Sequence, residues 1–290
     1  MKKLRQVTVI GMGLLGGSIT LAVSRASGGI KTVGYSHRAS TRAKARRLRV
    51  ADEVVNNLQE SVACADIVIL ATPVCTFEDM FAQIADALPA GCIVTDIGST
   101  KVMPHRWAAR RLPTNVHYVG SHPIAGSEQR GVEFARDDLL DRALCILTAT
   151  QSTNRRALET LKRFWLSLGC TVRLLSPRQH DRIFADVSHL PHITAAALIN
   201  ASDSAELRFA GKGFMDTSRI ASGPANIWAD VLLTNAANCA KGIDRVTREL
   251  ARLKRAIRSG DIKRIERLLD AARNKRSKLI EYKMSRKELI

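Results

Sequence analysis

Gln6-Val-Thr-Val-Ile-Gly-Met-Gly-Leu-Leu-Gly16 is the stretch that decides the fold of this chain of 290 residues. Its first half, residues 6–10, is a short apolar run rich in β-branched side chains, which predicts a buried strand. Residues 14–27 carry apolar side chains at helical spacing, so the glycines lie in a turn between a strand and a helix. This order predicts the first unit of an α/β fold with a parallel sheet.

The glycine spacing in this turn, Gly11-x-Gly13-x-x-Gly16, is typical of a dinucleotide-binding loop when it stands between a strand and a helix. Gly11 permits the tight turn, Gly13 lets the backbone approach a pyrophosphate, and Gly16 allows close packing of helix and strand. Leu14 and Leu15 open the helix, whose N-terminus would face the phosphates. We therefore expect these five residues to bind the cofactor. A glycine-rich turn without a ligand is the alternative.

The end of the second predicted strand, residues 32–35, bears on which dinucleotide binds. In NAD-binding proteins an acidic residue about twenty positions after the glycines holds the ribose 2′-hydroxyl. Here residues 36–41 read Ser-His-Arg-Ala-Ser-Thr, and their hydroxyls, imidazole and guanidinium suit a 2′-phosphate. A solvated basic loop that touches no cofactor is the alternative. We expect NADP rather than NAD, bound through Ser36, His37, Arg38 and Thr41.

Strands and helices keep alternating up to about residue 175. Each predicted strand is an apolar run that ends in a polar turn, as expected where ligands lie at the carboxyl ends of a doubly wound parallel sheet. Thr72-Pro73 is one of these turns, and we expect both residues to border the cofactor. The further strands predicted for this single sheet are residues 67–70, 93–96, 116–120, 144–148 and 171–175, with helices at 77–88 and 155–168.

After Ser176-Pro177 the strand pattern stops and long helical periods take over. We therefore predict a dinucleotide-binding domain over residues 1–176 and an all-helical substrate and dimerisation domain over residues 177–290. The last two helices carry more apolar surface than one small domain needs to cover itself, which favours a homodimer formed through them. The predicted helices are 179–201, interrupted at Pro191, 227–258 and 262–282, and the predicted linker after the first is 211–223.

The composition indicates a soluble globular protein with a strong positive charge. Hydrophobic residues make up 46% of the chain, no apolar run approaches the ~20 residues of a membrane helix, and no signal peptide is expected. Lys and Arg outnumber Asp and Glu by 45 to 27, giving a net charge of +18. Aromatic residues are only 4% and no nucleic-acid-binding motif occurs, so an anionic small substrate or a generally basic proteome explains the charge better than binding of DNA or RNA. The six cysteines are scattered, which predicts reduced thiols in the cytoplasm.

Several polar clusters could carry chemistry beyond the glycine loop. His122 is expected on a turn that follows a strand ending at Gly120, where it would face the cofactor or, alternatively, only solvent. His189 and His192 lie one helical turn apart at a proline, and could bind zinc, form a buried structural pair or recognise an anion. No carboxylate or cysteine cluster accompanies them, so we expect no metal. Arg219 follows the predicted linker and is a candidate clamp for a substrate carboxylate.

Taken together, these blocks make the chain resemble the prephenate/arogenate dehydrogenase family of tyrosine biosynthesis. The resemblance runs in order over essentially the whole chain. The glycine loop is common to many families, whereas the other four blocks in combination are specific. The matching blocks are the glycine loop, Asp96-x-x-Ser99-x-Lys101, Gly120-Ser-His122-Pro-Ile-Ala-Gly-Ser-Glu128, Ser188-His-Leu-Pro-His192 and Gly213-Phe-Met-Asp216-Thr-Ser-Arg219-Ile-Ala.

The resemblance implies an oxidative decarboxylation. A cyclohexadienol loses a hydride from its ring C4 to the nicotinamide and a proton from its hydroxyl, and its ring carboxylate leaves as carbon dioxide. His122 matches the family's catalytic histidine, and a neutral imidazole is a suitable proton acceptor at neutral pH. Ser99 matches the serine that orients the hydroxyl and helps to place the nicotinamide. Arg219 matches the arginine that binds a substrate carboxylate, and His189 and His192 lie in the motif that shapes that pocket.

Two departures from the family pattern bear on the site. Ser121 stands where glycine is usual, and would add a substrate-binding hydroxyl beside the catalytic histidine. The basic run after the second strand replaces the acidic residue of NAD-preferring members, in agreement with NADP. Asp216, Glu128 and Trp228 match positions behind the substrate or at its entrance. Arogenate carries an ammonium group where prephenate has a keto group, and Asp216 and Glu128 are the only acidic candidates for binding that ammonium. The choice between prephenate and arogenate therefore stays open.

Two other functions are compatible with parts of the sequence. A β-hydroxyacid dehydrogenase also joins an N-terminal dinucleotide domain to helices, but that class relies on a catalytic lysine in its helical domain. A non-catalytic, NADP-sensing protein would use the basic helices as a partner surface. It would have no need for Ser99, His122, His192 and Arg219 together.

Overall fold

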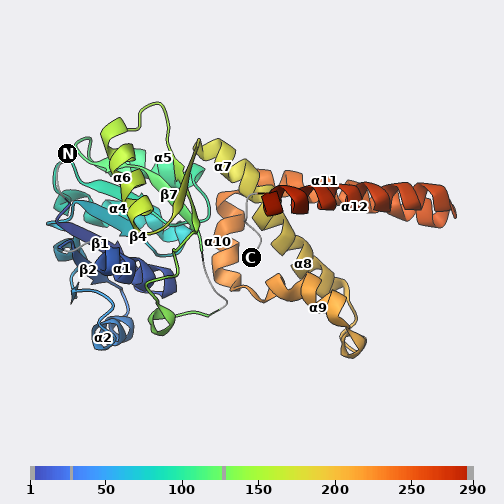
Figure 1. Cartoon of the computed structure of the whole chain (residues 1–290), viewed down its shortest axis with the longest axis horizontal. Helices are drawn as coiled ribbons and strands as arrows, with labels where there is room; N and C mark the ends of the chain where they lie inside the picture. Colours follow the sequence, from blue (N-terminus) through green and yellow to red (C-terminus); the bar gives the residue numbers. More distant parts are fainter. Residues whose placement is uncertain (1–3, 27–28, 126–128, 286–290) are drawn as a thin grey trace. The chain divides into compact units, whose positions relative to one another are not determined.

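The computed structural model describes residues 4–26, 29–125 and 129–285 of the chain (Figure 1). The chain forms two compact units, Met1–Asn238 and Cys239–Ile290. The first unit holds both sheets and the helices packed on them, and the second holds most of two long helices.

The first sheet is parallel and has six strands in the order β3-β2-β1-β4-β5-β6. This is the strand order of a doubly wound dinucleotide-binding sheet, so the predicted α/β class is confirmed. The central strands β1 and β4 are buried along their whole length, because helices cover both faces (Figure 1). The strands are β1 (Gln6–Ile10), β2 (Lys31–Tyr35), β3 (Glu53–Val54), β4 (Ile67–Leu70), β5 (Ile93–Asp96) and β6 (His117–Tyr118), and the helices among them are α1 (Leu14–Ala26), α2 (Ala39–Arg47), α3 (Leu58–Val62), α4 (Phe77–Ile84) and α5 (Val102–Arg111).

The last predicted strands do not extend this sheet but form a second sheet of three strands in the order β7-β8-β9. The predicted strand 116–120 divides at Val119, where β6 ends on the first sheet and the chain enters β7, which pairs antiparallel with β8. His122 therefore lies within a strand, opposite Ile146, and the predicted turn is wrong. Its neighbour Pro123 is tolerated because β7 is an edge strand. The three strands are β7 (Gly120–Ile124), β8 (Leu144–Thr148) and β9 (Thr171–Leu175).

Two apolar cores hold the first unit together, one on each face of the parallel sheet. Alternate residues of β4 divide between them, because successive side chains of a strand point to opposite faces: Ile67 and Ile69 join one core, Val68 and Leu70 the other. The first core also contains the fully buried Trp165 of α6 (Arg155–Ser167). Burying one large apolar side chain contributes about 1.5–3 kcal/mol, so these cores fix the sheet that carries the site.

The rest of the first unit is helical, and no strand follows Leu175 in the residues described. α7 begins with a capping box, in which Ser176 Oγ accepts from Gln179 N–H and the Gln179 side chain accepts from Ser176 N–H. A π-helical turn over Ala185–His189 joins α7 to α8. The helices are α7 (Pro177–Phe184), α8 (Leu190–Ala201), α9 (Lys212–Ser218) and α10 (Ala225–Thr234).

Two sequence predictions in the helical region are wrong. The predicted linker 211–223 contains α9 and a 3-10 turn. Its hydroxyl side chains bond back to carbonyls of their own helix, as Ser218 does to Phe214 at 2.7 Å. The predicted helix 227–258 is two helices, α10 and α11 (Ala236–Arg258). They separate at Asn235, whose side chain is held by contacts outside the helix.

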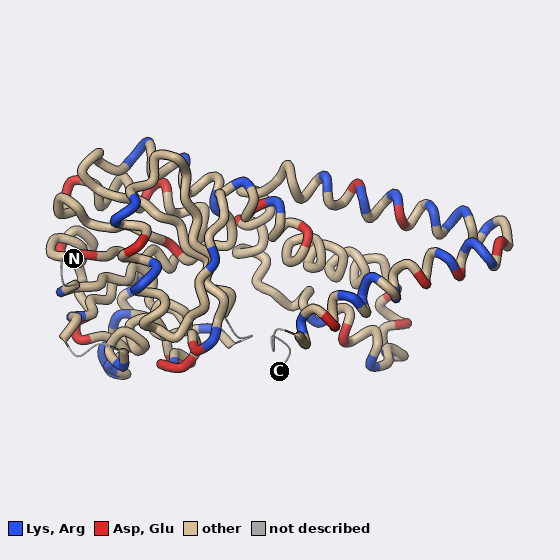
Figure 2. The backbone as a smooth tube through the Cα atoms, turned by 45° about the horizontal axis from the view of Figure 1, so that its top comes forward, with Lys and Arg blue, Asp and Glu red and all other residues tan. Residues whose placement is uncertain are grey.

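The second unit consists of most of α11 and of α12 (Ile262–Ser285), joined by a turn in which Gly260 has a φ of +62°. Lys and Arg recur along both helices (Figure 2). Apolar side chains between them are exposed, including Leu250, Leu269 and Leu279. Apolar helical faces are normally covered by another surface. None of the helices described has the length and apolar character that a membrane crossing requires.

The two compact units divide the chain at 238–239, later than the predicted domain boundary at 176–177. The reason is that the helices after residue 177 pack against the loops of the parallel sheet: the hydroxyls of Thr100 and Thr234, for example, lie 2.8 Å apart. A division based on packing does not test which residues serve which function, so the predicted domain boundary at 176–177 stays a prediction.

Candidate active site

A cavity of about 740 Å³ opens at the carboxyl ends of β1, β2 and β4. This is where ligands bind in a doubly wound sheet. Leu14, Leu15 and Gly16 in α1 and Ser99 after β5 lie outside its lining. The predicted cofactor-binding residues that do line it are Gly11, Gly13, Ser36, His37, Arg38, Thr41, Thr72 and Pro73.

The glycine loop has the shape that a pyrophosphate needs. Gly11 has a φ of +109°, and a Cβ there would lie 2.5 Å from the carbonyl oxygen of Ala71. A Cβ at Gly16 would lie 1.9 Å from the carbonyl oxygen of Gly11, so helix and turn touch through bare backbone. At Gly13 a Cβ would meet nothing within 4 Å, because this residue faces the open cavity. The residues present therefore fit the phosphates of a dinucleotide at the N-terminus of α1.

The loop after β2 presents basic and hydroxyl groups to the same cavity. Ser36 is buried, whereas His37 and Arg38 are exposed. Arg42 fixes the shape of this loop, because its guanidinium donates to the carbonyl oxygens of Ser36 at 2.6 Å and His37 at 3.0 Å. Arg38 is the guanidinium of this loop that lines the cavity.

Lys44 is a cavity residue that the sequence analysis missed. Its ammonium lies 2.9 Å from the carboxylate of Glu133, which also lines the cavity. Lys44 stands three residues after Thr41, and side chains at that spacing share one face of a helix. That spacing is the signal that could have identified it.

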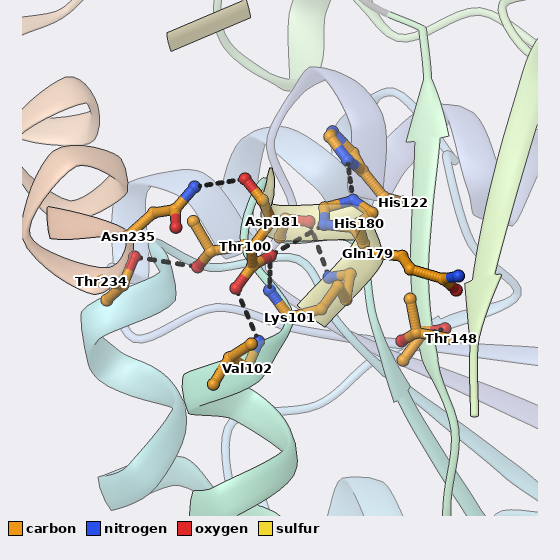
Figure 3. Close-up of polar contacts among 12 residues, drawn as sticks. Thr100, Lys101, Val102, His122, Thr148, Gln179, His180, Asp181, Thr234 and Asn235 are labelled. Atoms are coloured by element: carbon orange, nitrogen blue, oxygen red, sulfur yellow. Dashed lines mark hydrogen bonds and ion pairs between the residues drawn. The ribbon is translucent and has the colours of Figure 1, made fainter. Parts of the chain in front are cut away.

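His122 lies in the middle of β7, with its ring directed at α7 (Figure 3). Its Nδ1 is 2.8 Å from Nε2 of His180, and its ring centroid is 4.8 Å from that of Phe184. Burial lowers the pKa of His122 well below its ordinary value, and the positive charge of Lys101 lowers it further. The imidazole is therefore neutral at physiological pH, which is the form that can accept a proton.

His122 is linked to His180 and, through it, to Asp181, two residues that the sequence analysis did not single out. His180 is fully buried, and its Nδ1 lies 2.8 Å from Oδ1 of Asp181. The Asp181 carboxylate also accepts from the backbone N–H groups of Lys101 at 2.7 Å and Val102 at 2.8 Å (Figure 3). Burial lowers the pKa of His180 to about 2. In the sequence, this arrangement is indicated only by an adjacent His-Asp pair near the start of a capped helix.

Ser99 lies in the loop between β5 and α5, which a buried ion pair holds in place. The Lys101 ammonium donates to the Asp96 carboxylate and, at 2.6 Å, to the Gly98 carbonyl oxygen. Tyr118 donates its hydroxyl proton to the other Asp96 oxygen at 2.7 Å. Buried ion pairs are stable only with close geometry and additional hydrogen bonds, so this network specifies the loop tightly. The two charged ends of the Asp-x-x-Ser-x-Lys motif bind each other and fix the serine between them.

The two histidines of the helical region have different surroundings. His189 is fully buried, with Nδ1 3.2 Å from Nδ2 of Asn235, and burial lowers its pKa to about 4. His192 stacks on Trp228 with ring centroids 3.6 Å apart, and its Nδ1 is buried with no hydrogen-bond partner within the part of the chain described. No three His, Cys, Asp or Glu side chains in the described ranges are grouped as a metal site.

Arg219 begins the 3-10 turn after α9 and is exposed. The backbone of the next residue, Ile220, forms a hydrogen bond with His192, so the turn that carries Arg219 lies against this histidine. The structure therefore gathers the predicted residues into two groups. One contains His122 and the Ser99 loop, and the other contains His192 and Arg219.

Ser121 is not brought to the side of the strand that His122 occupies. Neighbouring side chains of a strand point to opposite faces, so these two residues diverge. The Ser121 hydroxyl is buried, 2.7 Å from the hydroxyl of Thr95, and it accepts from the Trp165 indole N–H at 3.0 Å. It joins the two sheets and α6 rather than facing a substrate. Glu128 lies outside the described residues.

Comparisons with known proteins identify the family to which the chain belongs. The model of the prephenate dehydrogenase nucleotide-binding domain matches residues 19–174, and that of the prephenate dehydrogenase dimerization domain matches residues 176–271. The chain is 32% identical to prephenate dehydrogenase of Bacillus subtilis (strain 168) over 94% of this chain and 76% of that one. It is 31% identical to cyclohexadienyl dehydrogenase of Zymomonas mobilis over 89% of this chain and 90% of that one.

A solved structure is similar over nearly the full length. Prephenate dehydrogenase from Aquifex aeolicus, in complex with hydroxyphenyl propionate and NAD⁺, superposes with a TM-score of 0.88. The two proteins are 32% identical, and the match covers 96% of this chain and 99% of that one. With the domain models and the relatives in agreement, the resemblance seen in the sequence is confirmed, and the chain belongs to the prephenate/arogenate dehydrogenase family.

Proposed function

We propose that the protein catalyses the NAD(P)-dependent oxidative decarboxylation of prephenate, arogenate or both in the biosynthesis of tyrosine. The observation that carries this proposal is His122, a buried neutral imidazole whose Nδ1 is bonded to His180, which leaves Nε2 to act on a substrate. The dinucleotide cavity at the carboxyl edge of the same fold and the family membership support it.

The reaction divides between the cofactor and the chain's own residues. A nicotinamide, when bound, supplies the acceptor for the hydride that leaves ring C4 of the substrate. His122 accepts the proton of the C4 hydroxyl at its Nε2, while the bond from the ring to its carboxylate breaks and releases carbon dioxide. Ser99 orients the hydroxyl, on a loop whose shape the Asp96–Lys101 pair holds. The ring thereby becomes aromatic.

Substrate binding falls to the second group of residues. Arg219 has a guanidinium that can hold a side-chain carboxylate in two parallel hydrogen bonds. His192, stacked on Trp228, offers a further polar contact. His189 lies behind this pocket, bonded to Asn235, and acts on the substrate through the position of α8.

We further propose that NADP is bound in preference to NAD. The support is the loop after β2, where Arg38, Thr41 and Lys44 line the cavity and no carboxylate stands at the end of the strand. Glu133 is a carboxylate on the cavity wall, and it is paired with Lys44. Two charge-assisted contacts to a 2′-phosphate at roughly 1.5 kcal/mol each would favour NADP by about 100-fold.

The organisation of the protein is part of the same proposal. We propose a dinucleotide-binding domain over residues 1–176 and a helical domain from residue 177. The change from one matching domain model to the next between residues 174 and 176 supports it. The exposed apolar positions of α11 and of the first part of α12, in the region matched by the dimerization-domain model, support a homodimer. The cysteines, none of them in a disulfide in the structure, support a cytoplasmic location.

A steady-state assay of prephenate and arogenate, each with NAD and with NADP, tests the activity directly. We expect reduced cofactor to accumulate, followed at its near-ultraviolet absorbance, in at least one NADP reaction. Carbon dioxide should be released in equal amount. If none of the four combinations reduces the cofactor, the proposed activity is wrong.

A further inference from the structure

A chain of hydrogen bonds leads from a buried carboxylate to the catalytic imidazole. Asp181 Oδ1 lies 2.8 Å from His180 Nδ1, and His180 Nε2 lies 2.8 Å from His122 Nδ1. His180 and Asp181 are 0% and 1% exposed, so water does not compete for these contacts. We call these three residues the imidazole chain (Figure 3).

The position of each proton along the imidazole chain follows from the state of Asp181, the residue at its buried end. Burial raises the pKa of Asp181, but both of its oxygens accept backbone N–H groups, those of Lys101 and Val102, and these bonds favour the ionised carboxylate. An ionised carboxylate only accepts, so the proton of neutral His180 must lie on Nδ1. His180 Nε2 is then an acceptor, and His122 has to donate its proton from Nδ1. The remaining nitrogen of His122, Nε2, is left without a proton.

The rings of the imidazole chain are also fixed in orientation. Phe184, one turn further along α7, stacks on His180 with ring centroids 4.4 Å apart and an interplanar angle of 23°. The same phenyl ring packs against His122 with centroids 4.8 Å apart. A single aromatic side chain therefore restrains both imidazoles, and neither can turn without losing this packing and a buried hydrogen bond.

We propose that His180 and Asp181 are positioning residues that hold His122 in the tautomer whose Nε2 lone pair accepts the substrate's proton. When that proton arrives, the Asp181 carboxylate, two hydrogen bonds away, offsets part of the charge on the buried imidazolium. Neither positioning residue needs to touch the substrate. The inference rests on the proposed function for its kinetic part only, because the tautomer of His122 is a property of the protein alone.

The Asp181 carboxylate also forms hydrogen bonds outside the imidazole chain. Its carboxylate binds the backbone at Lys101 and Val102, the residues that follow the Ser99 loop, so it also anchors the start of α5. A change at Asp181 would disturb both the loop and the imidazole chain. Changes at His180 are more specific, because its ring contacts His122, Asp181 and Phe184.

The kinetic test compares two variants of His180. His180→Phe keeps an aromatic ring but removes the acceptor for His122 Nδ1–H, so kcat should fall by about 100-fold or more, the range of a lost general base. His180→Gln places an amide oxygen near the former Nε2 and should recover kcat to within about tenfold of the wild type. KM for the substrate should stay within about twofold in both, because neither residue binds it.

The tautomer is read directly from ¹⁵N nuclear magnetic resonance of the full-length protein labelled at histidine, without substrate. His122 is assigned by the signal that disappears in His122→Asn. We expect a protonated Nδ1 and an unprotonated Nε2 in the wild type, and loss of this preference in His180→Phe. His105→Gln is the matched control. Its imidazole is also partly buried but is bonded to Thr148, and its loss should leave the His122 signal unchanged.

Three results would overturn the inference. The first is a wild-type His122 signal with the proton on Nε2, a measurement that needs no folded variant of His180. The second is a normal kcat in His180→Phe. The third is equal loss of kcat in the phenylalanine and glutamine variants with an unchanged His122 signal, which would mean a purely structural role. Failure of the proposed activity would appear only in the assay with the four substrate and cofactor combinations.

Discussion

The position of His122 on an edge strand gives it a fixed backbone and a ring held by two neighbours. Replacing it with asparagine keeps a polar group of similar size in β7 but removes the proton acceptor. We expect His122→Asn to lower kcat at least about 100-fold with little change in KM, since the imidazole acts mainly in the transition state. Steady-state kinetics with the better substrate measure this, and near-normal turnover would remove His122 from the mechanism.

Arg219 should affect binding rather than the rate of the chemical step. Arg219→Gln removes a charge-assisted contact to the side-chain carboxylate, so KM should rise roughly tenfold or more while kcat changes little. Arg208→Gln is a matched control, because Arg208 lies over the ring of Phe209 on the preceding 3-10 turn and is not part of the proposed pocket. An unchanged KM in Arg219→Gln would assign the carboxylate clamp to another residue.

Some residues of the site could be predicted from sequence, and others could not, for a physical reason. The Gly11 turn and the motif that carries Ser99 are local patterns, and the spacing of their residues indicates their role. His180 is recognisable only once it is seen beside His122, which is 58 positions away in the chain. Ser121 illustrates the converse. Its neighbour in sequence is His122, the proposed catalytic histidine, but strand geometry turns Ser121 to the other face.

At the scale of elements, the loop from β2 to α2 is the part that should choose the cofactor. Arg38→Ala should raise KM for NADP by roughly tenfold or more, because a guanidinium–phosphate contact contributes about 1.5–3 kcal/mol. KM for NAD should change by less than about twofold. Arg47→Ala, near the end of the same helix and outside the cavity lining, is the control. Equal losses with both cofactors would mean that this loop does not read the 2′-phosphate.

The pattern of strands and helices was predictable because hydrophobic period and glycine position are local. The sheet to which each strand belongs was not predictable from these local patterns. The run 144–148 has the pattern of a buried strand that could belong to either sheet, and only its pairing with β7 and β9 places it in the second one. The break between α10 and α11 was equally hidden, because Asn235 leaves the helical pattern to bind Asp181 and His189, contacts made far away in sequence.

Across the whole molecule, the buried imidazoles should make stability depend on pH. Burial lowers the pKa of His105 and of His189 to about 4 and that of His180 to about 2. Unfolding returns each pKa to about 6.5, so the unfolded chain binds more protons below that pH and the free energy of unfolding falls on acidification. The stability is fully present above about pH 7, and each imidazole with a folded pKa near 4 removes about 2 kcal/mol of it by pH 5.

Urea denaturation at pH 7.5, 6 and 5, at constant ionic strength, measures this effect. His105→Gln removes one of the buried imidazoles, so its loss of stability between pH 7.5 and pH 5 should be smaller than that of the wild type by up to about 2 kcal/mol. Identical pH profiles for the two proteins would show that His105 does not carry a lowered pKa in the folded state.

The π-helical turn at Ala185–His189 is equivalent to one inserted residue in an otherwise continuous helix from α7 to α8. Each residue turns a helix by about 100°, so this single insertion sets the angle between the part that carries His180 and the part that carries His192. Deleting the exposed Val187 should return the turn to regular helix and rotate α8 by that angle. Substrate KM should then rise steeply while the affinity for NADP, measured by the fluorescence of its reduced form, is retained. This one turn therefore sets the orientation of the proposed carboxylate-binding pocket at His192 relative to the proposed proton acceptor, which His180 contacts.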